Sequence, residues 1–137
     1  MSFGNFGEPG YGITRTFSDL SVEDAVTRVT EKLAAEGFGV LSTIDVSKTL
    51  DSKIGAKVRP YIILGACSPQ LALEAITEEP GIGLVMPCNV VVSLTDEDDV
   101  SVSVIDPVAL FKAVDRPDMA PFAQAVREQL ERVMMSM

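Results

Sequence analysis

The chain contains no histidine and no tryptophan. The missing histidine excludes Ser-His-Asp and Cys-His nucleophile systems within one chain, because both need an imidazole base. It also excludes zinc and haem sites that depend on histidine ligands. Acid–base chemistry would therefore fall to carboxylates, lysine, tyrosine or cysteine. No nucleophile–base pair is visible, so the sequence leaves open whether the protein is an enzyme.

Cysteine is scarce, and the two that occur, Cys67 and Cys88, do not make the disulfide framework of a small secreted protein. The N-terminus lacks the basic and apolar regions of a signal peptide. The longest uncharged run, residues 80–95, has 16 residues and an internal proline, whereas a membrane-spanning helix needs about 20. We therefore expect a soluble, cytoplasmic protein that does not enter a membrane.

Positive charge is also scarce, since the net charge is −9 and residues 61–111 contain no lysine or arginine. This acidity argues against binding to nucleic acid or to an anionic membrane. The basic side chains Lys48, Lys53, Lys57 and Arg59 lie just before the acidic region, with only Asp51 among them. One basic segment thus leads into an otherwise acidic molecule.

The length of 137 residues and the hydrophobic content of 47% fit one domain with a substantial core. Residues 1–10, rich in glycine, are expected to form a flexible N-terminal arm, and residues 11–137 a single α+β domain. Alternation and helical spacing predict strands at 11–17, 38–46, 61–66, 82–94 (broken at Pro87) and 100–104, and helices at 21–36, 47–54, 69–79, 106–114 and 118–137. Ser21, Ser68 and Asp106 are expected N-caps.

These elements predict a two-layer sandwich: a mostly antiparallel sheet of about five strands with helices packed on one face. The other face of such a sheet would need a partner. A homodimer is the simplest way to cover it.

Each cysteine lies where one structural element gives way to another. Residues 64–69 read Leu-Gly-Ala-Cys-Ser-Pro, residues 86–90 read Met-Pro-Cys-Asn-Val, and Asp106-Pro107 follows the last hairpin. In these motifs the chain resembles the domain-of-unknown-function 302 family over roughly residues 11–135. It departs from that family at Ser68, where asparagine is frequent; both residues cap helices.

The resemblance implies a β-α-β(4)-α domain similar to the TATA-box-binding fold, and a dimer. It implies no activity, and it leaves any cofactor unknown. A fold of this type does not by itself imply DNA binding, and the acidic charge argues against it.

Cys67 is expected just before a helix N-terminus, where the helix dipole favours a thiolate by about 0.3–1 kcal/mol. That would lower its pKa by less than one unit, so a reactive Cys67 would also need a cation such as Arg59 or Lys57. The alternative is a small buried apolar residue at a strand–helix junction. Similarly, Asn89 beside Cys88 either lines a site or anchors the bent backbone.

Three kinds of site remain open for the cysteines. A redox dithiol lacks the usual CxxC spacing. A soft-metal site could be completed as Cys₄ by two thiolates from each of two subunits. A small-molecule pocket could hold an anion through Arg59 and helix N–H groups.

We favour the small-molecule pocket slightly, with Arg59, Cys67, Ser68, Cys88 and Asn89 as its ligand-binding residues. The alternative is a structural homodimer without a ligand, in which these residues only fix strand–helix junctions. The acidic turn Asp96–Asp99 lacks the EF-hand pattern and is expected to be a solvated hairpin tip rather than a calcium site.

Overall fold

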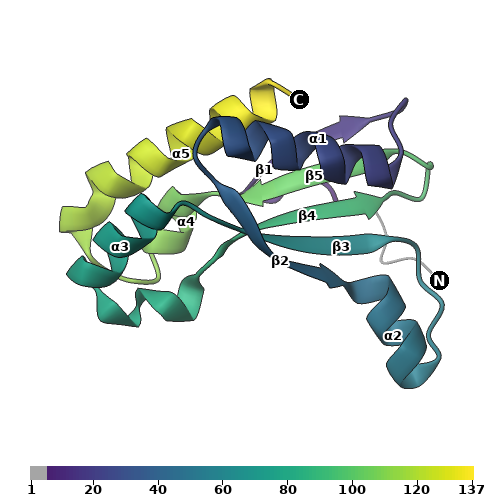
Figure 1. Ribbon diagram of the computed structural model, residues 1–137, viewed down its shortest axis with the longest axis horizontal. Helices are drawn as coiled ribbons and strands as arrows, with labels where there is room; N and C mark the ends of the chain where they lie inside the picture. The colour runs from purple at the N-terminus through teal and green to yellow at the C-terminus, as the bar shows by residue number, and fades with distance from the viewer. Residues whose placement is uncertain (1–5) are drawn as a thin grey trace.

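The computed structural model describes residues 6–137, so half of the arm expected at residues 1–10 lies outside the described part. A sheet of five strands runs through the molecule (Figure 1) in the order β1-β5-β4-β3-β2, and every neighbouring pair is antiparallel. The strands are β1 (Gly12–Phe17), β2 (Gly39–Asp45), β3 (Tyr61–Cys67), β4 (Cys88–Leu94) and β5 (Val100–Ile105). The predicted five-stranded antiparallel sheet is confirmed.

The two long helices, α1 (Val22–Ala35) and α5 (Ala120–Met135), lie side by side on one face of the sheet. The shorter elements stand at the two ends of the strands (Figure 1). These are α2 (Val46–Ile54), α3 (Pro69–Glu78), α4 (Pro107–Phe111) and the 3₁₀ helices η1 (Pro80–Val85) and η2 (Pro117–Met119). The two-layer α+β class expected from the sequence is therefore confirmed.

Capping residues and glycines determine where α1 and α2 begin and end. The Ser21 hydroxyl accepts a hydrogen bond of 3.0 Å from the Asp24 backbone N–H, which caps α1. Gly37 follows α1 with φ +87°, and Gly55 ends α2 with φ +68°. Both angles lie in the left-handed region, which glycine adopts without steric cost.

The strand predicted for residues 82–94 is only half correct. Residues 80–85 form the 3₁₀ helix η1, and β4 begins at Cys88 after a cis peptide bond between Met86 and Pro87. The apolar composition of the run did not distinguish the two structures. The backbone bonds locally instead, with the Ile82 N–H donating to the Glu79 carbonyl oxygen at 3.0 Å.

The core lies between the sheet and the two long helices. Its fully buried side chains include Leu64, Val90, Val92, Val100, Val102 and Val104 of the strands and Val29, Leu33, Leu130 and Val133 of the helices. The alternating strand residues point to the opposite face, which these helices do not cover. There, the Thr14 and Ser103 hydroxyls lie 2.7 Å apart. No helix in the described part of the chain is long and apolar enough to cross a membrane.

Candidate functional site

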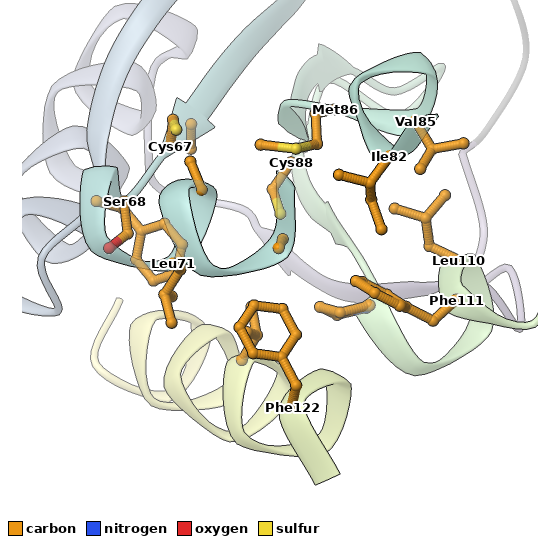
Figure 2. A pocket seen from close by; sticks show the side chains of 16 residues that line it. Cys67, Ser68, Leu71, Ile82, Val85, Met86, Cys88, Leu110, Phe111 and Phe122 are labelled. Atoms are coloured by element: carbon orange, nitrogen blue, oxygen red, sulfur yellow. The ribbon is translucent and has the colours of Figure 1, made fainter. Parts of the chain in front are cut away.

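The molecule has an apolar cavity of about 50 Å³ where the last residues of β3 and the first of β4 meet α3, η1, α4 and α5 (Figure 2). Sixteen residues line it. They are Phe38, Ala66, Cys67, Ser68, Leu71, Ala72, Ala75, Ile82, Val85, Met86, Cys88, Pro107, Leu110, Phe111, Phe122 and Val126. The two cysteine motifs recognised in the sequence thus meet at one cavity.

Residues at the starts of α3 and α4 fix the helices that form the walls of this cavity. Pro69 occupies the first turn of α3, where a missing N–H costs nothing. The Asp106 carboxylate accepts a hydrogen bond of 2.9 Å from the Val108 N–H and so caps α4. Its second oxygen accepts from Arg127 Nε at 3.0 Å, which ties α4 to α5. Asp106 is therefore a structural residue behind the cavity wall.

The lining carries no charged side chain. Its only polar side-chain atoms are the two thiols and the Ser68 hydroxyl. Phe111 and Phe122 meet edge to face with ring centroids 5.8 Å apart, and Ile82 is only 2% exposed. The cavity is thus a low-dielectric space, suited to neutral groups rather than to ions.

Cys88 lies on the helix side of the sheet, packed against the main core. Burial raises the pKa of its thiol to about 11, and the neighbouring Cys67 adds to the effect. At neutral pH the Cys88 side chain is therefore an uncharged thiol. It is a poor nucleophile in this state, because the thiolate is the reactive form.

Cys67 lines the same cavity, but its side chain leaves the sheet in another direction. Ala66 is paired with Cys88, and successive strand residues point to opposite faces. Cys67, the next residue, should therefore point away from the Cys88 thiol, as Figure 2 shows. The two cysteines are not bonded to each other. This arrangement does not favour a redox dithiol.

Ser68 is the N-cap residue of α3, as expected, but its side chain makes no capping hydrogen bond. Its backbone is extended, with φ −99° and ψ +119°. The residue is half-buried beside the cavity (Figure 2). The capping role expected of the Ser68 hydroxyl is therefore corrected, and this oxygen remains a hydrogen-bonding group in the cavity lining.

Arg59 lies at the other end of β3 from Cys67. Its guanidinium forms an ion pair with Asp98 in the turn between β4 and β5. The seven residues of β3 separate Arg59 from the cavity by roughly 20 Å, at about 3.3 Å per residue. The structure thus does not bring Arg59 to the cysteines, and the single site expected from the sequence is corrected on this point.

Asn89 is also separated from Cys88, by the sheet itself. It is paired with Gly65, is exposed, and faces the side of the sheet that α1 and α5 leave uncovered. There it lines a shallow hollow with Phe6 and Pro9 of the N-terminal segment. Strand alternation explains this separation, because adjacent residues point to opposite faces.

Gly65 allows the close packing of this region. A Cβ atom added there would meet the Ser42 hydroxyl and lie 2.8 Å from Pro87 Cγ, closer than carbon atoms can approach. The rigid proline ring cannot easily move aside. The glycine in the first cysteine motif and the proline in the second are therefore a packed pair across β3 and β4.

Sequence reasoning missed most of the cavity lining. The predicted strand at 82–94 includes Ile82, and no motif in the predicted helices at 106–114 and 118–137 indicates a cavity. Apolar spacing along a helix indicates which side is buried but not whether that side meets a neighbour or a cavity. A cue was present in the small residues Ala72 and Ala75, which leave room on the inner side of α3.

No group of three or more histidine, cysteine, aspartate or glutamate side chains within residues 6–137 is arranged to hold a metal ion. Cys67 and Cys88 could contribute to a thiolate site only with further ligands. A soft-metal site at a dimer interface would also require both thiols to reach that interface.

Comparison with known proteins agrees with this fold. The family model described as "Domain of unknown function DUF302" matches residues 13–137. The chain belongs to the DUF302 family. The crystal structure of an uncharacterised conserved DUF302 protein from Bacillus stearothermophilus is similar, with a TM-score of 0.84 and 26% identity over 91% of this chain and 96% of that chain. No curated protein matches this DUF302 domain.

Proposed function

We propose that this DUF302 domain binds a small neutral, mostly apolar molecule, or the apolar end of a larger one, in the cavity beside Cys88. The observation that carries the proposal is a cavity whose lining side chains are all uncharged, at the place where the two cysteine motifs meet. Pockets for small molecules are typically apolar with a few polar groups that orient the ligand. Ser68 and the two thiols supply those groups here.

The size of the cavity limits the ligand. One water molecule needs about 10–15 Å³ of this kind of volume, so about 50 Å³ holds roughly three or four water-sized groups. A short aliphatic chain fits this space, whereas a drug-sized molecule needs several hundred Å³. The preferred occupant is therefore a small aliphatic group.

Charge argues for a neutral ligand and against the anion expected from the sequence. Arg59 is paired with Asp98 at the far end of β3, and the lining supplies no other cation. The N-terminus of α3 would offset only about 0.3–1 kcal/mol of the cost of burying a carboxylate. That cost is several kcal/mol or more without a paired charge.

The matched probes hexanol and hexanoate test this proposal, because they share an aliphatic chain and differ in charge. Methyl NMR spectra would be recorded during titration with each compound at neutral pH. We expect hexanol to shift the methyl resonances of Ile82, Leu110 and Met86 in a saturable manner. Hexanoate should bind at least tenfold more weakly.

Two substitutions on α3 make the test specific. Ala75 lines the cavity and is buried, so Ala75→Leu should fill the space and abolish the hexanol shifts. Leu73 points outward on the same helix, so Leu73→Ala should leave them unchanged. Equal hexanol binding by wild-type protein and Ala75→Leu, or no saturable shift at all, would contradict the proposal.

A further inference from the structure

A second hollow lies on the face of the sheet that α1 and α5 leave uncovered. Its lining includes Asn89 and Val91 of β4, Ser103 of β5, and Phe6 and Tyr11 of the N-terminal segment. Val91 is paired with Ser103, and strand residues two positions apart point to the same face, so Asn89 lies beside them. We call this space the Asn89 hollow. It shares no lining residue with the cavity on the helix side.

Backbone hydrogen bonds hold the N-terminal segment at this place. The Gly12 N–H donates to the Pro9 carbonyl oxygen at 3.0 Å, and the Tyr11 carbonyl oxygen accepts from the Asp106 N–H at 2.8 Å. Gly12 also leaves space beside the strands, because a Cβ atom added there would lie only 2.9 Å from Ser103 Oγ. The Asn89 hollow is therefore preformed by contacts within a single chain, as small-molecule sites generally are.

The lining combines aromatic rings with one carboxamide and has no charged side chain. The Asn89 side chain is exposed and makes no hydrogen bond within the described part of the chain. Its NH₂ group can donate and its carbonyl oxygen can accept, so it is complementary to another amide. The Ser103 hydroxyl, by contrast, is already hydrogen-bonded to Thr14. Tyr11 is 64% exposed and can contact a second ring.

We infer that the Asn89 hollow binds a single planar ring that carries an amide group. The ring lies against Tyr11 and Phe6, and the amide pairs with the Asn89 side chain. The volume selects this size: about 90 Å³ holds roughly six to nine water-sized groups of about 10–15 Å³ each, which is one substituted ring. Stacking on an aromatic side chain tolerates many rings, so the amide determines specificity. The inference does not rest on the proposed function of the other cavity.

Benzamide and benzoate test this inference, because they share a ring and differ in the group that meets Asn89. NMR spectra of the full chain would be recorded during titration with each compound at neutral pH. We expect benzamide to shift the Asn89 side-chain NH₂ and the Val91 methyl resonances in a saturable manner. Benzoate should bind roughly tenfold more weakly, because it cannot donate a hydrogen bond and the lining supplies no cation. The methyl resonances of Ile82 and Leu110, across the sheet, should not move.

Three substitutions make the test specific. Asn89→Leu should weaken benzamide binding roughly tenfold, with the Val91 methyl shifts as the readout. Gln124→Leu is the matched control, because it also removes an exposed carboxamide, from α5 on the other side of the sheet, and should change nothing. Tyr11→Leu should weaken binding roughly threefold through loss of the ring. All three side chains are exposed, so far-UV circular dichroism should show an unchanged fold.

Three results would overturn the inference. The first is the absence of a saturable shift at Val91 with benzamide. The second is equal benzamide binding by wild-type protein and Asn89→Leu, or equal binding of benzamide and benzoate. The third is a benzamide shift at Ile82 that Ala75→Leu abolishes, because it would place the ring in the other cavity. Hexanol binding at that cavity is measured separately, so either site can fail without the other.

Discussion

The two ends of the sheet differ in how far their apolar side chains are buried. At the cavity end, α3, η1, α4 and α5 enclose Ile82 almost completely, and the lining has no charge. At the opposite end, none of the residues of α2 is buried, Ile54 is exposed to solvent, and the helix carries Lys48 and Lys53. The difference indicates that an isolated chain satisfies its own packing at one end only.

The comparison separates two kinds of surface. The cavity end is concave and preformed by contacts within the chain, as small-molecule sites generally are. The end that carries α2 projects and exposes both apolar and charged side chains. The following predictions test this contrast, beginning with the largest expected effect.

The same substitution at the two ends should have very different effects. Ile82→Ala should lower the free energy of unfolding by about 2–5 kcal/mol, because it leaves a void in an enclosed region. Ile54→Ala should change it by about 0.5 kcal/mol or less in the monomer. Urea unfolding followed by circular dichroism measures both.

Protein concentration supplies the control for this pair. The loss of stability caused by Ile82→Ala arises within one chain and should not depend on protein concentration. Any loss of stability at Ile54 should grow with protein concentration only if α2 contacts a second copy of the chain, because association stabilises the folded state by mass action. A loss of several kcal/mol at Ile54 that does not depend on concentration would show that α2 packs within its own chain.

Alkaline pH should lower the free energy of unfolding through ionisation of the Cys88 thiol. The pKa of this thiol is raised from 9.0 to about 11 in the folded protein. The neutral thiol thus contributes stability that is complete below pH 9 and is lost between about pH 9 and 11. The shift corresponds to about 2–3 kcal/mol.

Urea unfolding from pH 7 to 11 tests this prediction when wild-type protein is compared with Cys88→Ala. Other groups, including Tyr61, whose pKa burial also raises, titrate in both proteins and cancel in the difference. The two stabilities should converge above pH 9. If the free energies of unfolding of the two proteins differ by the same amount at every pH, Cys88 is not the group that lowers the stability at alkaline pH.

Arg59→Ala should have the smallest effect. It removes an ion pair with Asp98, whose side chain is 79% exposed, and exposed pairs contribute at most about 1 kcal/mol. Hexanol binding should be unchanged, because Arg59 lies roughly 20 Å from the cavity. Weaker hexanol binding in this variant, with stability unchanged, would revive the single site predicted from the sequence.

Several parts of the fold could be predicted because their causes are local. Ser21 and Asp106 cap helices through hydrogen bonds to residues two or three positions on. Gly37 and Gly55 end helices because their backbone angles suit glycine. Alternating valines and serines in β5 predicted a strand with one apolar face. The two cysteine motifs lie at junctions that meet at one cavity.

Other parts depended on contacts that no local pattern contains. Residues 82–87 belong to the strand that the sequence predicts, but the structure has a 3₁₀ helix from Pro80 to Val85. Its Ile82 packs near Phe111 and Phe122. Arg59 and Cys67 lie in one short segment of sequence, yet an extended strand holds them at opposite ends of the sheet.

By itself the sequence determined the fold class, the caps at Ser21 and Asp106, the absence of imidazole chemistry and the acidic charge, because each depends on composition or on residues within a few positions. Only the tertiary structure decided that Cys88 faces an apolar cavity, that Asn89 faces the other side of the sheet, and that α2 projects alone. These depend on strand pairing and on packing between distant segments, where a shift of one residue reverses the direction of every side chain.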